Sequence, residues 1–258
     1  MRNIAAILLA LATASAVRGD EAKKAVLNVG GTDDPGGTVT GLVRFAGPKP
    51  DVGQISGILG NAFCKEHCAG GQAPKEEKFV FGRNGSDETL QNVLVYVSKG
   101  LEGKTFAPPK TPVVLDQVGC VYTPHVVGVM VGQTLEIRNS DATLHNVMTM
   151  PRKNKSFNEG MPVKGGKLEK VFAEAEMKVD LRCFMHPWML AWVHVLPHPY
   201  YAITQEDGRF TIKGLPPGEY EISVLHETSR LQPTANAIKV VVKAGETATA
   251  DFTYKKED

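Results

Sequence analysis

The sequence has 258 residues, of which 42% are hydrophobic and 22% charged, so the chain is long enough to bury a sizeable core. Its 29 Lys and Arg nearly balance its 28 Asp and Glu, and no long block carries charges of one sign. This balance disfavours nucleic-acid binding and attraction to an anionic membrane surface, because both depend on a strong positive field.

The N-terminus has the pattern of a secretory signal peptide. Arg2 precedes an apolar stretch at 4–12, and small residues follow at 14–16. The alternative is a membrane anchor, but the apolar stretch is far shorter than the roughly 20 residues that span a bilayer, and no later segment approaches that length. We therefore expect removal of residues 1–19, a periplasmic or secreted protein, and no stable membrane span.

The first part of the mature chain is predicted to be a leader followed by a β segment. Residues 20–37, rich in Lys, Gly and Asp, have no hydrophobic period and predict a flexible leader. Residues 38–47 and 90–97 have the composition of strands, whereas residues 48–78 are rich in Gly, Pro and Lys and predict a loop. Together these stretches predict an N-terminal β segment with a long loop over residues 38–112.

The rest of the chain also predicts strands. Residues 113–197 contain short apolar runs separated by turn signals, and short strands at regular spacing are typical of a β-sandwich or barrel. Residues 198–258 contain alternating runs joined by tight turns at 207–208 and 216–218. We therefore expect an all-β protein.

The heptapeptide CFMHPWM, residues 183–189, contains three candidate metal ligands. A turn after Cys183 would bring Cys183, His186 and Met189 to one point, and a thiolate, an imidazole and a thioether together favour copper over hard cations. A copper site with one thiolate and an axial Met requires a second histidine. His145 is the candidate, because two strand ends 38 residues apart in the sequence can lie side by side in a sandwich.

Residues 113–197 resemble the cupredoxins in three motifs, VMVGQTLEIRNSD, HNV and CFMHPWM, and the two-residue gaps of the last are similar to those of amicyanin-like members. The resemblance implies a Greek-key β-sandwich or barrel that binds one type 1 copper. The ligands that it implies are His145, Cys183 and His186 in the equatorial plane and Met189 as a weak axial ligand. It also implies that Asn146 forms hydrogen bonds that hold the ligand loop and tune the Cys183 sulfur.

The function that this resemblance implies is the transfer of single electrons between redox partners, such as a cytochrome or a dehydrogenase. His186 would be the electron port, with Pro187 and Trp188 as a docking patch. No second set of paired histidine motifs indicates another copper centre, so we expect no enzyme activity. The alternatives are a copper-binding or copper-sequestering protein, and an envelope binding scaffold with no role in electron transfer.

Three further cysteines, Cys64, Cys68 and Cys120, cannot all pair with one another. An oxidising compartment favours a disulfide, and a bridge to Cys120 would staple the loop 48–78 with a stabilisation of roughly 3 to 4 kcal/mol. Related cupredoxin-like sequences carry one cysteine in this loop and one in a stretch similar to GCVYTPH. That resemblance favours Cys64 with Cys120 and leaves Cys68 free or intermolecular.

The C-terminal stretch DGRFTIKGLPPGEYEISV resembles the carboxypeptidase regulatory-like β-sandwich. This resemblance implies a second small sandwich, and residues 38–100 would supply its first strands. We expect either that the cupredoxin segment is inserted into this split sandwich or that the two domains stand in tandem.

We expect structural roles for the remaining histidines. His125 begins an apolar run and is expected to cap a strand or to lie at the surface. His194 and His198 follow the ligand loop, and a second metal site built from them is the alternative to ordinary packing. His67 lies in CKEHC, which lacks the Cys-x-x-Cys-His spacing that attaches haem.

Overall fold

The computed structural model describes residues 36–68 and 72–256. The predicted signal peptide, residues 1–19, and all but the last two residues of the predicted leader, residues 20–37, lie outside the described residues. The described chain forms twenty strands, one α-helix and one 3-10 helix, which confirms the predicted all-β class. No helix in these two ranges is long and apolar enough to cross a membrane.

The first sandwich is built from consecutive strands between residues 113 and 196. Its five-stranded sheet has the order β10-β9-β12-β13-β7. These strands are β7 (Val126–Met130), β9 (His145–Thr149), β10 (Phe157–Met161), β12 (Glu176–Arg182) and β13 (Leu190–Leu196). Its four-stranded sheet has the order β11-β8-β5-β6. These strands are β5 (Val113–Val118), β6 (Val121–Thr123), β8 (Thr134–Asn139) and β11 (Gly166–Val171).

Alternation of buried and exposed residues explains how these two sheets share a core. In β5, the residues Val113, Leu115 and Gln117 are buried while their neighbours are less so. Leu115 of one sheet belongs to the same apolar cluster as Val147 and Val193 of the other. One face of each sheet is therefore buried against the other, as the period of two in the sequence predicts.

The second sandwich is built from strands on both sides of the first in sequence. Its four-stranded sheet has the order β14-β4-β16-β18. These strands are β4 (Leu94–Lys99), β14 (Tyr201–Ile203), β16 (Gly218–Leu225) and β18 (Ala237–Val242). The larger sheet runs β17-β20-β1-β3-β2, with β15 and β19 also paired to β1. Its strands are β1 (Gly37–Ala46), β2 (Phe81–Asn84), β3 (Asp87–Leu90), β15 (Arg209–Leu215), β17 (Leu231–Pro233), β19 (Thr247–Thr249) and β20 (Phe252–Lys256).

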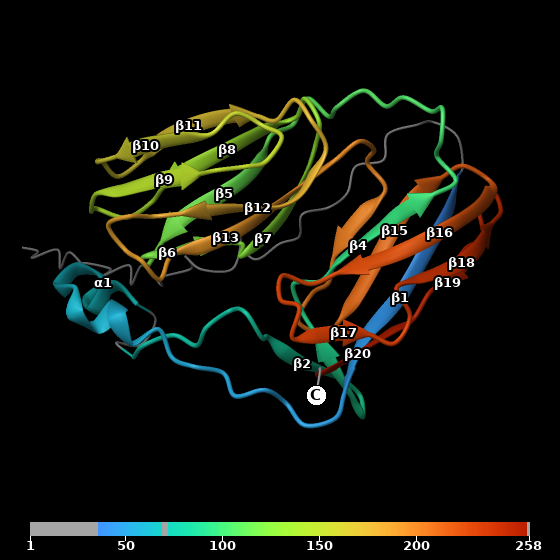
Figure 1. The fold of residues 1–258 in the computed structure, drawn as a ribbon, viewed down its shortest axis with the longest axis horizontal. Helices are drawn as coiled ribbons and strands as arrows, with labels where there is room; N and C mark the ends of the chain where they lie inside the picture. Colours follow the sequence, from blue (N-terminus) through green and yellow to red (C-terminus); the bar gives the residue numbers. More distant parts are fainter. Residues whose placement is uncertain (1–35, 69–71, 257–258) are drawn as a thin grey trace, which may run out of the picture.

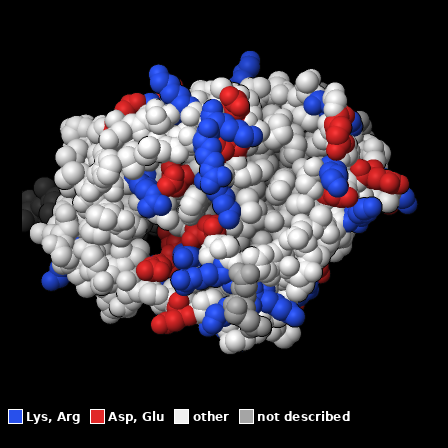
Figure 2. Space-filling model, viewed as in Figure 1, with Lys and Arg blue, Asp and Glu red and all other residues white. Residues whose placement is uncertain are grey.

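The two sandwiches lie side by side (Figure 1). A small apolar cluster joins them, in which Val126 and Met130 of the first sandwich contact Leu94, Tyr201 and Ile203 of the second. On the face drawn in Figure 2, acidic side chains gather in a hollow near the middle of the molecule, with Lys and Arg side chains beside them. The junction between the sandwiches therefore combines apolar packing with charged groups.

The connection from β1 to β2 contains the only helices of the described chain, where the sequence predicted a loop. They are the 3-10 helix η1 (Ser56–Gly60) and the helix α1 (Ala62–His67). Asn61 begins α1 because its side-chain oxygen accepts a hydrogen bond from the N–H of Cys64 at 3.0 Å. Ile58 and Cys64 are fully buried in the core of the first sandwich. We call residues 55–68 the cap, because they cover one end of this sandwich (Figure 1).

Candidate metal centre

The predicted ligands lie at one end of the five-stranded sheet. His145 is the first residue of β9, and Cys183 directly follows β12. These strands are antiparallel neighbours with Arg182 opposite Met148, so the start of β9 meets the end of β12. The order of strands in the sheet therefore brings together two residues that are distant in the sequence.

Three donor atoms converge at this end of the sheet. The Nδ1 atoms of His145 and His186 lie 2.9 Å apart, and the Cys183 sulfur lies 3.7 Å from His186 Nδ1. One donor atom from each of these three residues lies within 4.8 Å of the other two. The exposed fraction is 0% for His145, 3% for Cys183 and 2% for His186. The three donors thus face one another away from water, at separations that suit a shared metal ion.

Met189 closes the loop that carries two of these donors. Its N–H donates a 2.8 Å hydrogen bond to the His186 carbonyl, and its carbonyl accepts from the Cys183 N–H at 3.4 Å. These bonds turn residues 183–189 back on themselves. The Met189 side chain is 1% exposed and belongs to the same apolar cluster as Cys183.

Asp141 fixes the orientation of His145 and was not predicted from the sequence. Its Oδ2 lies 2.9 Å from His145 Nε2, and its two oxygens accept hydrogen bonds from the N–H groups of Gly119 and Cys120, both at 2.8 Å. Burial raises the pKa of Asp141, but the hydrogen bonds outweigh it and leave the pKa below its usual value. An ionised carboxylate only accepts, so His145 Nε2 carries a proton and its Nδ1 presents a lone pair to the cluster.

Asn146 contacts the other side of the ligand loop. Its side-chain oxygen accepts from the N–H of Phe184 at 2.7 Å, and its own N–H points at the Cys183 sulfur at 3.5 Å. Burial raises the pKa of Cys183, but hydrogen bonds from His145 and from backbone N–H groups lower it by more. The surroundings of the sulfur therefore favour a thiolate, which is the form that binds metals.

The cap covers the outer edge of His186. The Asn61 Nδ2 lies 3.4 Å from His186 Nε2, and the Trp188 ring lies 5.2 Å from the His186 ring between centroids. Trp188 is anchored in turn, because its Nε1 donates to the Cys120 carbonyl at 2.9 Å. His186 does not reach the surface as the expected electron port would. Phe184, 62% exposed, and Met185, 54% exposed, are the large exposed apolar residues of the ligand loop. Of the expected docking patch, Pro187 is exposed and Trp188 is half-buried.

Cys64 and Cys120 form a disulfide that fastens the cap to the first sandwich, with a Cα separation of 5.6 Å. This is the pairing that the sequence analysis favoured. Cys68 is free and 5% exposed, and its thiol donates to the Lys65 carbonyl within the cap.

The donor set at this centre fits a soft or borderline transition metal. Two Nδ1 lone pairs at 2.9 Å repel unless a proton or a cation lies between them, and a thiolate adds a third donor. Two imidazoles and one thiolate suit copper or zinc, and a neighbouring Met is characteristic of copper electron-transfer sites. Asp141 is engaged with His145 and two backbone N–H groups, so the cluster does not have the carboxylate-rich character that Mg²⁺ or Ca²⁺ requires.

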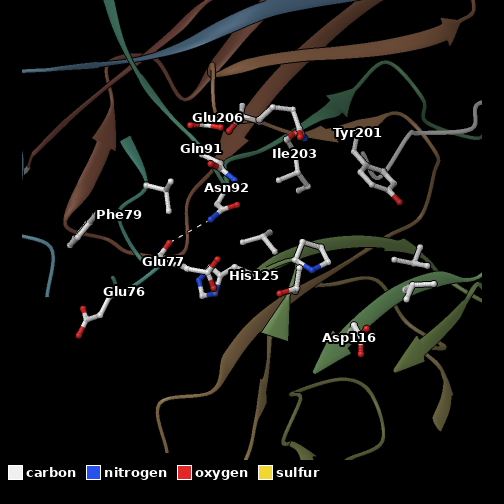
Figure 3. Close-up of a pocket in the computed structure, with 18 of the residues that line it drawn as sticks. Glu76, Glu77, Phe79, Gln91, Asn92, Asp116, His125, Tyr201, Ile203 and Glu206 are labelled. Carbon is white, nitrogen blue, oxygen red and sulfur yellow. Dashed lines mark hydrogen bonds and ion pairs between the residues drawn. The ribbon is translucent and has the colours of Figure 1, made fainter. Parts of the chain in front are cut away.

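A separate cleft of about 1120 Å³ lies between the two sandwiches (Figure 3). Asn92 and Ile203 line it from the second sandwich, and His125 lines it from the first. In Figure 3 the Asn92 amide points toward Glu77, whose carbonyl it meets at 3.5 Å. None of the four predicted ligands lines this cleft, so it is distinct from the metal centre.

His125 differs from its predicted place at a surface or a strand cap. It is 6% exposed, its Nε2 lies 2.5 Å from Glu227 of the second sandwich, and its Nδ1 donates to the Leu190 carbonyl at 3.1 Å. His194 and His198 are also buried, and neither belongs to a group of possible metal ligands among the described residues. The sequence pattern missed the His125 pair because its partner lies 102 positions away.

Comparison with known proteins gives partial structural likenesses. No protein-family model and no curated protein matches the sequence. A copper-containing nitrite reductase from Thermus scotoductus is 21% identical over 38% of this chain and 24% of its own, with a TM-score of 0.31. The chain therefore spans about a quarter of the length of that enzyme.

Two smaller proteins are matched over nearly their whole length. A purple cupredoxin from Nitrosopumilus maritimus is 26% identical over 32% of this chain and 98% of its own, with a TM-score of 0.28. The amicyanin from Paracoccus versutus is 26% identical over 39% of this chain and 96% of its own, with a TM-score of 0.30. The structural neighbours of the chain are thus cupredoxins, each matched over less than two fifths of it.

Proposed function

We infer that the chain is a type 1 copper protein that transfers single electrons between redox partners. The observation that supports this most strongly is the convergence of His145 Nδ1, His186 Nδ1 and the Cys183 sulfur within 4.8 Å in a buried pocket. Two imidazoles, one thiolate and a neighbouring methionine are the ligands of copper electron-transfer sites. Met189 in the same loop would be the weak axial ligand.

The residues around the donors would keep the ligand geometry constant during electron transfer. Asp141 holds the His145 proton on Nε2, so that Nδ1 is free to bind, and Asn146 ties the two ligand segments together. A bound copper ion would supply the one-electron couple. Because the ligands are already positioned, little rearrangement would accompany a change of charge at the site. The proposal assigns no catalysed reaction to the chain.

The partner would be another redox protein, such as a cytochrome or a dehydrogenase, in the periplasm or outside the cell. Phe184 and Met185 are large exposed apolar residues beside Cys183, and Pro187 of the same loop is also exposed, whereas His186 lies beneath the cap. Weak redox encounters use small contact surfaces, and this part of the loop offers one. We therefore place the exchange of electrons at Phe184 and Met185, away from His186.

The test is titration of the mature protein with Cu(II), followed by visible absorption and electron paramagnetic resonance. We expect an intense thiolate-to-copper band at one copper per chain, bleached by ascorbate. Cys183→Ser should abolish the band, whereas Cys68→Ser, which removes the other free buried thiol, should leave it unchanged. A colourless wild-type protein, or a band that survives Cys183→Ser, would refute the proposed centre.

Copper sequestration is a second candidate function, favoured by the cover over His186. The 2% exposure of this ring would slow both copper loss and the approach of a partner to its edge. Stopped-flow mixing of the reduced protein with a small oxidant and with oxidised cytochrome c separates the two functions. A carrier exchanges electrons rapidly with both, whereas a sequestering protein retains copper without passing electrons to the cytochrome.

A further inference from the structure

The Cys64–Cys120 disulfide lies beside the metal centre and could itself become a binding site. Donor atoms of Cys64, Cys120 and His186 all lie within 4.8 Å of one another. Cys120 also forms a second group of this size with Asp141 and His145. The disulfide therefore stands next to both histidines of the copper centre, on segments other than the one that carries Cys183.

The ability of this group to bind a metal depends on whether the two sulfurs are oxidised to a disulfide or reduced to thiols. In the disulfide they are poor ligands, because the thiolate is the form that binds metals. Two thiolates bound to one ion at about 2.3 Å lie about 4 Å apart, a separation that rotation of the side chains can reach from a Cα distance of 5.6 Å. Thiolates select soft ions, above all Cu(I).

We propose that the Cys64–Cys120 disulfide is the oxidised form of a second soft-metal site, which binds Cu(I) through Cys64 and Cys120 after reduction, with His186 as a neighbouring donor. An external dithiol would supply the two electrons and two protons and leave as its own disulfide. Binding of the ion would then displace the two thiol protons. The site shares His186 with the proposed copper centre but does not require Cys183.

The surroundings of the disulfide suit such a role. Asn61, one turn before Cys64, already places its amide beside His186 Nε2, on the ring edge opposite the cluster of Nδ1 atoms. The cap also borders a cavity of about 610 Å³, lined by Gly57, Trp188 and Met189 among others. Reduction would release the covalent fastening of the cap next to this space. Cys68, whose thiol bonds to the Lys65 carbonyl within the cap, is a free thiol and is removed in the test so that it cannot bind Cu(I) itself.

The test uses the full mature chain with Cys68→Ser and Cys183→Ser, which leaves Cys64 and Cys120 as its only cysteines. One half of the sample stays oxidised, and the other is reduced with a phosphine under nitrogen and freed of reductant. Both are titrated with Cu(I) against a chromogenic Cu(I) chelator. We expect the reduced form to retain about one more Cu(I) per chain than the oxidised form, because only it offers two thiolates. X-ray absorption should show two sulfur neighbours around that copper.

Two results would overturn the proposal. One is equal Cu(I) retention by the oxidised and reduced forms, and the other is extra copper that remains when Cys120→Ser is added to the same background. Circular dichroism verifies the fold of each variant. If Cys120→Ser does not fold, X-ray absorption of the protein that keeps Cys64 and Cys120 decides the question. It counts the sulfur neighbours of the copper and so distinguishes two thiolate ligands from none. The blue band of the wild-type protein is measured separately, so loss of the copper centre and loss of this second site are distinguishable.

Discussion

The Asp141 carboxylate lies 2.9 Å from His145 Nε2 and closes a buried chain of contacts that runs from the backbone of Cys120 to the candidate metal centre. Both residues are at most 5% exposed. A buried carboxylate bonded to the outer nitrogen of a ligand histidine fixes the tautomer and raises the basicity of the inner nitrogen.

Asp141→Asn should weaken copper binding by about 10- to 100-fold, because the amide removes the negative charge from His145 while keeping a similar shape. Competition with a Cu(II) chelator measures the affinity. Asp251→Asn, in an exposed ion pair of the second sandwich, is the control and should leave the affinity unchanged. Wild-type affinity in Asp141→Asn would show that the carboxylate is structural only.

Asn61→Ala should speed the loss of copper to a chelator. It removes the side-chain oxygen that accepts the hydrogen bond at the start of α1 and the amide nitrogen that lies 3.4 Å from His186 Nε2. The lost helix cap should also cost about 1 kcal/mol of the free energy of unfolding. Asn61→Ser keeps a capping oxygen but is too short to reach the ring. If the two variants lose copper at the same accelerated rate, the contact between Asn61 and His186 controls release. If Asn61→Ser behaves as wild type, the hydrogen bond that begins α1 controls release.

The His125–Glu227 pair should make stability depend on pH. Burial lowers the pKa of His125, but the bond to Glu227 raises it above 6.5 overall. Burial raises the pKa of Glu227, but the bond to His125 brings it below 4.5. The histidine contribution is complete below pH 6.5 and is lost as the pH rises through its folded pKa. The glutamate contribution is complete above pH 4.5 and is lost as the pH falls through its folded pKa.

His125→Gln should therefore lower the free energy of unfolding most between pH 4.5 and 6.5, by about 3 kcal/mol, with a smaller difference on either side. Urea unfolding across this range measures it. Other charges face the pair, namely Glu77, Lys78, Lys178 and His226. Because Glu77 and His226 interact with His125 directly, the difference between the two curves reports His125 together with its coupling to these two groups. A difference that does not change with pH would contradict the ion pair.

Gly128→Ala should destabilise the junction between the sandwiches. A Cβ at this position of β7 would lie 2.2 Å from Cε2 of the buried Tyr201 ring in β14. Relief of that overlap requires movement of packed groups, at a cost of about 1 to 3 kcal/mol in thermal or urea unfolding. Gly160→Ala is the control, because a Cβ there meets no other atom within 4 Å. Equal stabilities of the two variants would refute this account of the close approach.

The sequence predicted the features that depend on local pattern. Cys183, His186 and Met189 could be grouped because they share one loop, and His145 could be added because polar turn residues mark the start of its strand. Asp141 lies in the same turn, four residues before His145. A carboxylate so close to a candidate ligand histidine was the available sign that the two side chains interact. Asp141 was missed despite this local signal, and the other residues missed are those whose role depends on distant packing. Asn61 meets His186 across 125 positions, and a six-residue helix is too short to display a period.

The placement of β1 has a consequence for the order in which the protein folds. Apart from β3, every strand paired with β1 comes from residues 209–256, close to the end of the chain. During synthesis those partners emerge only after residue 208, whereas all strands of the first sandwich have emerged by residue 196. Because contacts between distant segments form slowly, the sandwich that holds the metal centre should fold first, and the other should close only after its last strands have been made. A chain that stopped after β13 would thus retain every candidate copper ligand and still leave β1 with only β3 as a partner.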